Sequence, residues 1–257
     1  HVYPLKGGRS VDMAEVVLDR FGPQGDRRWL VADLAGNQIT QREIARLCQV
    51  VALPAAGGLR LEAPAAAPLL VPIPPASADR RVVRVWDHQI AALFAGTAAE
   101  IWFTQLFGTP CQLVYCPDES DRRTDPHYDP IGGAVSFADG YPILIIGEAS
   151  LAELNGRLAA PVPMTRFRPN IVVTGSGPFA EDGWTKFSIG PVEFAAVKPC
   201  ARCVVPTTDQ LTAERGPEPL RTLAAYRKVG SAVMFGMNVV HRSSGRIRIG
   251  DQLEVKR

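Results

Sequence analysis

The sequence predicts a mostly β fold of the α+β class, with two β-barrel-like halves, from three observations. Short β-type segments bounded by glycine and proline occur along the whole chain of 257 residues. Helical segments are few and short. A polar, charged stretch without periodicity, residues 116–130, separates two strand-rich regions. We therefore expect an N-terminal half over residues 1–120 and a C-terminal half over residues 121–257.

The N-terminal half begins with a predicted hairpin. One strand runs over residues 29–32, a turn follows at residues 35–37, and residues 38–41 return. The proline-rich stretch 63–79 is interpreted as an edge strand and loop, because proline cannot donate within a central strand. The pattern predicts further strands over residues 58–64, 80–86 and 111–116.

Three helices are predicted, two of them from capping boxes. Thr97 with Glu100, and Ser150 with Glu153, have the spacing in which a hydroxyl and a carboxylate cap each other's backbone N–H groups. The third helix is expected over residues 220–228.

The C-terminal half is rich in strands and glycine turns. The last ten-residue pattern, residues 246–255, predicts a hairpin that turns at Gly250 and Asp251. The other strands are expected over residues 142–147, 170–175, 186–190, 192–197 and 232–240.

Composition excludes several classes of partner. The 28 cations and 26 anions give a net charge of +2, too little for the basic field that nucleic acid requires. No apolar run reaches the ~18 residues needed to span a bilayer, and the first residues lack a signal-peptide pattern. Five cysteines, an odd number at low density, do not form a disulfide framework. We expect a cytoplasmic protein without a nucleic-acid or membrane partner.

The stretch KPCARCVVPTTD places Cys200 and Cys203 three residues apart, and four interpretations remain open. A zinc site would need a second pair, such as Cys111 and Cys116, but Cys111 lies in an apolar strand pattern. A thioredoxin-like pair would open a helix, which residues 204–206 disfavour. Two inert, half-buried cysteines are the third interpretation. We interpret Cys111, like Cys48, as a core residue.

The fourth interpretation is one thiolate that binds a thiophilic metal. The positive charge of Arg202 favours the thiolate form of a neighbouring cysteine. One thiolate cannot hold such a metal alone, so the other ligands would come from a cofactor, which needs a cradle. Each cationic cradle candidate, taken alone, is more typical of a solvated surface residue than of a binding site. The candidates are Lys6 in a glycine loop, Arg27, Arg42, Arg166, Arg168 and Asn170.

Several motifs, in this order along the chain, give the sequence a resemblance to a known family. They are YPLKGG, DRRWLV, ITQRE, FADGYP, FRPN, KPCARC, FGMNVV and a terminal GD-x-L-x-V. Together they resemble the MOSC family. The similarity is greatest to the branch with an N-terminal MOSC β-barrel module, which contains the mitochondrial amidoxime reducing component and bacterial reductases of N-hydroxylated bases.

The resemblance implies a molybdenum cofactor, a molybdopterin (pyranopterin dithiolene) with a terminal phosphate, in a cleft to which both halves contribute. It assigns the metal to Cys203 and leaves the role of Cys200 open. Lys6 and Gly7 match a Lys-Ser phosphate grip in which glycine replaces serine. Asp139 is the candidate proton donor or substrate-orienting group. The implied cofactor-binding residues are Lys6, Gly7, Arg27, Gly140, Tyr141, Arg168, Asn170, Ala201, Arg202 and Asn238.

The implied function is a molybdenum-dependent oxidoreductase. It would reduce N-hydroxylated substrates (amidoximes, hydroxylamines, N-hydroxylated purine bases) by removing the oxygen atom with two electrons. The alternatives are a sulfur carrier that transfers a persulfide and a non-catalytic cofactor-binding protein. The sequence lacks the C-x₄-C-x₂-C run of a ferredoxin-like domain. Either such a domain has been removed or a separate redox protein donates the electrons. We expect a separate electron donor, such as a 2Fe–2S ferredoxin or a flavin reductase.

Overall fold

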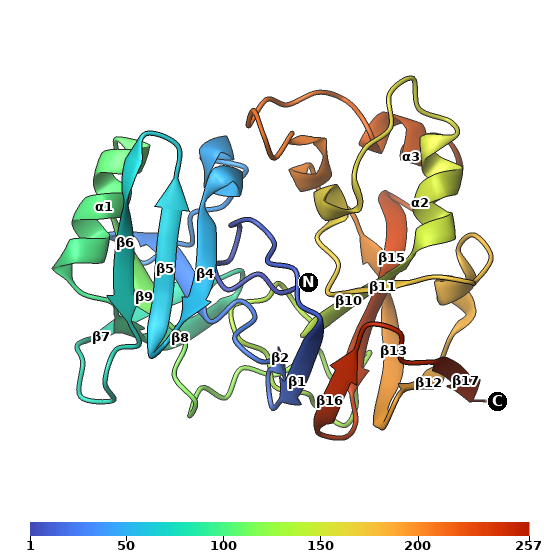
Figure 1. Ribbon diagram of the computed structural model, residues 1–257, viewed down its shortest axis with the longest axis horizontal. Helices are drawn as coiled ribbons and strands as arrows, with labels where there is room; N and C mark the ends of the chain where they lie inside the picture. The colour runs from blue at the N-terminus through green and yellow to red at the C-terminus, as the bar shows by residue number, and fades with distance from the viewer. Residues whose placement is uncertain (257) are drawn as a thin grey trace.

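The computed structural model describes residues 1–256 and consists mainly of β-sheet in two lobes, with the N-terminus between them (Figure 1). One lobe holds the elements from β3 to β9, and the other those from β10 to β17. Within residues 1–256, the helices lack the length and apolar character that crossing a bilayer requires.

The N-terminal half contains two antiparallel sheets and one helix, α1 (Thr97–Phe107), with the short 3₁₀ helix η1 (Ala45–Gln49). One sheet has the order β3-β9-β8-β7, and its strands are β3 (Trp29–Asp33), β9 (Cys111–Tyr115), β8 (His88–Phe94) and β7 (Arg80–Val85). The other has the order β4-β5-β6, with β4 (Val51–Ala55), β5 (Gly58–Ala63) and β6 (Ala66–Pro72). The strands predicted from residues 58, 80 and 111 are confirmed, and the proline-rich stretch does form an edge strand, β6.

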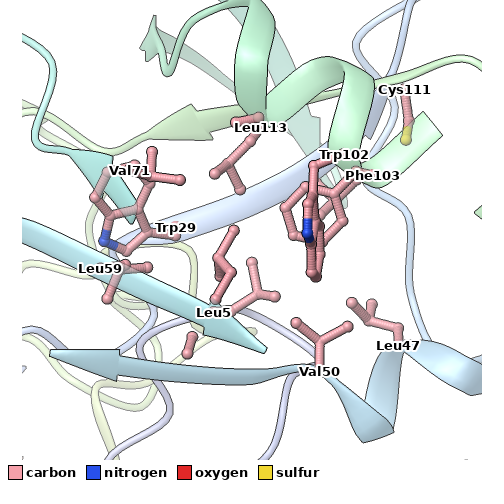
Figure 2. Close-up of a cluster of buried hydrophobic side chains, with 14 of the residues drawn as sticks. Leu5, Trp29, Leu47, Val50, Leu59, Val71, Trp102, Phe103, Cys111 and Leu113 are labelled. Atoms are coloured by element: carbon pink, nitrogen blue, oxygen red, sulfur yellow. The ribbon is translucent and has the colours of Figure 1, made fainter. Parts of the chain in front are cut away.

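The core of this half lies between its two sheets and α1 (Figure 2). Trp102 and Phe103 of α1 meet edge to face, with ring centroids 4.8 Å apart. Leu5 and Leu47 are fully buried in the same cluster. Cys111 is also fully buried there, which confirms its core assignment.

The cysteines of the two halves are not gathered into a zinc site. Cys48 is fully buried, as expected, and Cys116 belongs to a separate buried cluster of the N-terminal half. Within residues 1–256, no group of three or more His, Cys, Asp or Glu side chains is arranged to hold a metal ion. All five cysteines are free.

The C-terminal half is built on a seven-stranded sheet with the order β11-β10-β15-β13-β12-β17, in which β14 pairs with β15. Its helices are α2 (Glu148–Asn155) and α3 (Leu220–Tyr226), and its 3₁₀ helices η2 (Met164–Phe167), η3 (Ala180–Gly183) and η4 (Val205–Thr207). The strands are β10 (Ile143–Gly147), β11 (Ile171–Val173), β12 (Lys186–Ile189), β13 (Val192–Ala201), β14 (Lys228–Val229), β15 (Ala232–His241) and β17 (Leu253–Lys256).

The N-terminal segment ties the halves together. Leu5 is buried in the core of the N-terminal half, whereas Leu18 is buried in the core around β10 and β15. The strand β1 (Glu15–Asp19) pairs with β2 (Gly22–Pro23) and with β16 (Gly245–Arg248). The first residues of the chain therefore contribute to both halves. The division at residue 120 remains a prediction.

Two local predictions are wrong for reasons of long-range pairing. The terminal hairpin does not form, because β16 pairs with β1 and β17 pairs with β12. Residues 38–41 do not return as a strand: only Gln38 bridges to Ala32, and the chain then leads into η1.

Both predicted capping boxes are wrong as well, although their helices exist. The N-cap of α1 is Gly96, without a side-chain cap. Ser150 lies inside α2, and its hydroxyl donates to the buried carboxylate of Glu181 at 2.8 Å. Because the Ser150 hydroxyl is hydrogen-bonded to Glu181, it does not cap a backbone N–H group at the start of the helix.

Candidate functional site

A pocket of about 310 Å³ lies between the two halves; the cradle candidate Arg166, which pairs with Asp209 at 2.7 Å, does not line it, but all the residues that the resemblance implies do. They come from stretches far apart in the chain: Lys6, Gly7, Arg27, Asp139, Gly140, Tyr141, Arg168, Asn170, Ala201, Arg202, Cys203 and Asn238. The fold therefore gathers them at one place, whatever their individual roles. The lining also includes Arg42, a cradle candidate, and Lys198, which sequence reasoning missed.

The deep wall of the pocket is organised by Asp26, which is 2% exposed. Its Oδ1 accepts from the backbone N–H of Tyr3 at 2.8 Å and from Nδ2 of Asn170 at 3.0 Å. Its Oδ2 pairs with Arg27, whose Nη1 also donates to Oδ1 of Asn170 at 2.9 Å. Burial raises the pKa of Asp26, while Arg27 opposes that shift. This network fixes Arg27 and Asn170 before any ligand arrives.

The fully buried ring of Tyr3 lies behind the same wall, against its two arginines. The guanidinium carbons of Arg27 and Arg168 each lie 4.3 Å from its centroid. Burial raises the pKa of Tyr3 to about 12 and lowers that of Arg168 to about 10. Both arginines have positive φ, 46° for Arg27 and 60° for Arg168, a conformation that costs free energy outside glycine. Two fixed cations therefore face the pocket.

Lys6 and Asp139 form an ion pair at the pocket. Nζ of Lys6 lies 2.5 Å from Oδ1 of Asp139, and the indole N–H of Trp86 donates to the same oxygen at 3.1 Å. Lys6 is 8% exposed, and burial lowers its pKa. Burial alone would raise the pKa of Asp139, but its side chain is 68% exposed and Lys6 holds that pKa below its usual range. Asp139 is therefore ionised at neutral pH and suited to accept hydrogen bonds rather than to donate a proton.

The loop that carries Asp139 is held by Arg122, which sequence reasoning missed. Its buried guanidinium donates to the carbonyl oxygens of Ser136 at 2.9 Å and Ala138 at 2.5 Å, and also to that of Asp139. Arg122 belongs to the polar stretch 116–130, whose lack of periodicity gave no sign of this contact. Burial lowers the pKa of Arg122, and Asp139 opposes that shift.

The end of β13 forms another part of the lining. The β13–β15 ladder shifts register between Ala196 and Lys198 and again between Pro199 and Ala201, next to the cysteines. Such bulges change the direction of side chains in a strand. Asn238 of β15 donates to the carbonyl of Lys198 at 3.1 Å and steadies this segment.

Cys200 and Cys203 both line the pocket as free, half-buried thiols, but their surroundings differ. Nη1 of Arg202 donates to Sγ of Cys200 at 3.0 Å, and its Nη2 donates to the carbonyl of Phe167 at 2.8 Å. The cation expected beside the ligand cysteine thus engages its neighbour instead. Cys200 packs partly against the core that contains Phe167 and Phe235.

The lining fits an anionic, polar cofactor. Its only carboxylate within residues 1–256 is Asp139, against six cations: Lys6, Arg27, Arg42, Arg168, Lys198 and Arg202. Three lining residues each carry a buried polar atom that has no hydrogen-bond partner within residues 1–256. These atoms are Gln41 Oε1, Tyr141 OH and Arg202 Nε. Buried polar atoms of this kind are normally satisfied, so a bound polar ligand would complete them.

Gly7 explains the departure from the expected Lys-Ser pair. Its φ is +79°, and a Cβ at this position would lie 2.5 Å from Cδ2 of Leu47. A serine therefore does not fit without movement of Leu47. The carbonyl of Gly7 accepts from Nε2 of Gln41 at 2.6 Å, and the N–H groups of Lys6 and Gly8 donate to the carbonyls of Trp29 and Leu5. Among the contacts described for residues 1–256, the N–H of Gly7 is the one backbone donor of this turn left for an anion.

Comparison with known proteins gives matches over nearly the whole chain. The model of the MOSC N-terminal beta barrel domain matches residues 1–110, and that of the MOSC domain matches residues 132–254. Human mitochondrial amidoxime-reducing component 1 is 34% identical over 97% of this chain and 80% of its own. Rat mitochondrial amidoxime reducing component 2 is 35% identical over 97% and 80%. Molybdenum cofactor sulfurase of Solanum lycopersicum is 28% identical over 98% of this chain and 35% of its own.

Proposed function

The chain belongs to the MOSC family, and from that premise we propose that it is a molybdenum-cofactor-dependent reductase of N-hydroxylated compounds. The observation that carries the proposal is the union, in one pocket, of a free cysteine with six cations and an ionised carboxylate. Relatives that align with 97% of this chain are named amidoxime-reducing components, which supports the substrate class.

Molybdopterin, when bound, would supply a metal that takes up oxygen and exchanges two electrons. Cys203 is the proposed metal ligand. Arg27 and Arg168 would hold the pterin by planar, charge-assisted hydrogen bonds, and Asn170, which accepts from Arg27, would keep that guanidinium in place. Lys6 has three N–H donors, so it can bind a phosphate oxygen and still donate to Asp139.

The reaction consumes two electrons and two protons for each N–O bond broken, R–C(NH₂)=N–OH + 2 e⁻ + 2 H⁺ → R–C(NH₂)=NH + H₂O. Asp139 is ionised, so its carboxylate would orient the substrate by accepting an N–H of the amidoxime. The ammonium of Lys6 is the proposed source of a proton, because burial lowers its pKa and it lies beside Asp139. Solvent would then reprotonate it.

The test combines metal analysis with turnover. Protein from a host that makes molybdopterin should contain about one molybdenum per chain. With a reduced viologen as the electron donor, it should convert benzamidoxime to benzamidine. Protein that holds molybdenum but reduces no amidoxime, hydroxylamine or N-hydroxylated purine would contradict the proposal.

A sulfur-transfer function is the second candidate, favoured by the similarity to a molybdenum cofactor sulfurase over 98% of this chain. In that case Cys203 would carry a persulfide, and cyanide would release one thiocyanate per chain. The reductase proposal expects no cyanide-labile sulfur on Cys203. A non-catalytic cofactor binder would contain molybdenum without turnover.

The proposed reductase needs an electron source. We propose a separate redox protein in the cytoplasm, a 2Fe–2S ferredoxin or a flavin reductase. Titrating such proteins against the amidoxime assay, in place of the viologen, tests this step directly.

A further inference from the structure

Among the six lining cations, Arg42 and Lys198 are the two whose side chains form neither an ion pair nor a hydrogen bond within residues 1–256; Arg168 and Arg202 form no ion pair but do donate hydrogen bonds. Arg42 comes from the N-terminal half, after β3, and Lys198 from β13 of the C-terminal half. Within residues 1–256, neither lies within 4.0 Å of a carboxylate oxygen, whereas Lys6 and Arg27 each do. Two charges at one pocket therefore remain available to a ligand.

Each of these cations is held by an aromatic ring. The guanidinium carbon of Arg42 lies 4.8 Å from the ring centroid of Trp86, and Nζ of Lys198 lies 4.0 Å from that of Tyr128. A ring restricts the flexible stem without neutralising the charge. The two cations are thus positioned in advance, which lowers the entropy cost of binding an anion.

The exposure of the rings separates this pair from the deep wall. Trp86 is 44% and Tyr128 is 37% exposed, so Arg42 and Lys198 lie toward the open side of the pocket. Lys6, by contrast, is 8% exposed, and its Nζ forms an ion pair with Oδ1 of Asp139 at 2.5 Å. The carboxylate of the pocket is therefore already balanced, and the open side keeps an excess of positive charge. Such a charged recess attracts ions of the opposite sign.

We propose that the open side of the pocket selects N-hydroxylated substrates that carry an anionic group, a carboxylate or a phosphate, away from the N–OH. Arg42 and Lys198 are the specificity-determining residues, and they act on the substrate's charge rather than on the bond that breaks. This inference rests on the proposed reductase function and narrows its substrate class.

The experiment compares matched substrates on the molybdenum-loaded enzyme with a viologen donor. Benzamidoxime is neutral, 4-carboxybenzamidoxime is its anionic counterpart, and 4-phosphonooxybenzamidoxime separates phosphate from carboxylate recognition. We expect kcat/KM to be about threefold to tenfold higher for the anions than for the neutral compound, through KM, with the gain shrinking as salt rises. Arg42→Gln and Lys198→Gln should each remove most of that gain, measured as the ratio of kcat/KM for the anionic and the neutral substrate on the same variant.

Lys228→Gln is the control, because Lys228 is exposed on β14 and does not line the pocket. It should keep the full preference for anions. The molybdenum and pterin content of each variant is measured in parallel. If Arg42→Gln or Lys198→Gln loses the cofactor, these cations serve the cofactor and the proposal is overturned.

A binding measurement separates this inference from the proposed function. Calorimetry on the loaded, oxidised protein should show that 4-carboxybenzamidoxime binds more tightly than benzamidoxime, and that Arg42→Gln abolishes the difference. If no substrate is reduced but the binding preference remains, the reductase function is wrong and the anion selectivity of Arg42 and Lys198 stands. If benzamidoxime is reduced but neither anion is preferred, the reductase function stands and the anion selectivity is wrong.

Discussion

The deep wall and the open side of the pocket use their charges in opposite ways. On the deep wall, Asp26 is fully engaged by Tyr3, Arg27 and Asn170. On the open side, Arg42 and Lys198 each lie over an aromatic ring, and neither forms an ion pair within residues 1–256. The difference indicates that the fold itself fixes the charges of the deep wall before any ligand binds, whereas the charges of the open side are left without a partner. Substitutions should therefore affect stability on one side and binding on the other.

The largest stability effect is expected at Asp26. Asp26→Asn would leave the buried Arg27 without its counter-charge, and breaking a buried pair costs about 3–5 kcal/mol. Chemical denaturation should report this as a lower midpoint. Asp12→Asn is the control, because Asp12 is 82% exposed beside His1 and should cost no more than ~1 kcal/mol. Equal effects of the two substitutions would contradict the distinction between fold and ligand charges.

A smaller loss of stability is expected at the glycine loop. Gly7→Ser forces its Cβ against Leu47 and should cost about 1–3 kcal/mol from overpacking, in addition to backbone strain. Gly25→Ser isolates the strain, because Gly25 has a similar φ of +82° with nothing within 4 Å of its Cβ. The double variant Gly7→Ser/Leu47→Ala should lose less stability than the sum of the two single variants. Additive losses would show that Leu47 does not exclude the serine.

The mildest test concerns pH. Burial lowers the pKa of Lys6 from its usual value of 10.5, so as the pH rises its ammonium loses its proton earlier than that of an exposed lysine. The turnover rate should therefore begin to fall at a pH below 10.5. Lys6→Gln should slow the reaction and remove this alkaline limb. Because the pKa of Asp139 is held below its usual range, no acid limb from this carboxyl is expected between about pH 5 and 8. An acid limb that Asp139→Asn abolishes would restore Asp139 as the proton donor.

Local patterns predicted those parts of the fold that depend on neighbours in the chain. The strands β5, β7 and β9 and the helix α1 were readable from alternation and apolar spacing. The terminal hairpin was not predictable in this way, because β16 pairs with β1, which lies more than 200 residues earlier in the sequence. In that pairing Glu15 opposes Arg248. The strands β1, β4 and β8 gave no sufficient local signal.

The site shows the same limit. Motifs identified Cys203, Lys6 and Arg168, and the structure gathers them at one pocket. Arg122 and Trp86 were missed, because their role depends on contacts with the Asp139 loop that only the tertiary fold creates. The contact of Arg202 with Cys200 rather than Cys203 also depends on the bulged end of β13, which no spacing in the sequence reveals.

The central claim, a molybdenum ion bound through Cys203, is tested most directly by X-ray absorption at the molybdenum edge. Cys203→Ala should lose one sulfur neighbour of the metal, or the metal itself, and all amidoxime reduction. Cys200→Ala should keep the sulfur count of the unaltered protein and most of the turnover, because its thiol contacts Arg202. If Cys200→Ala loses the sulfur neighbour and Cys203→Ala keeps it, the ligand assignment is wrong.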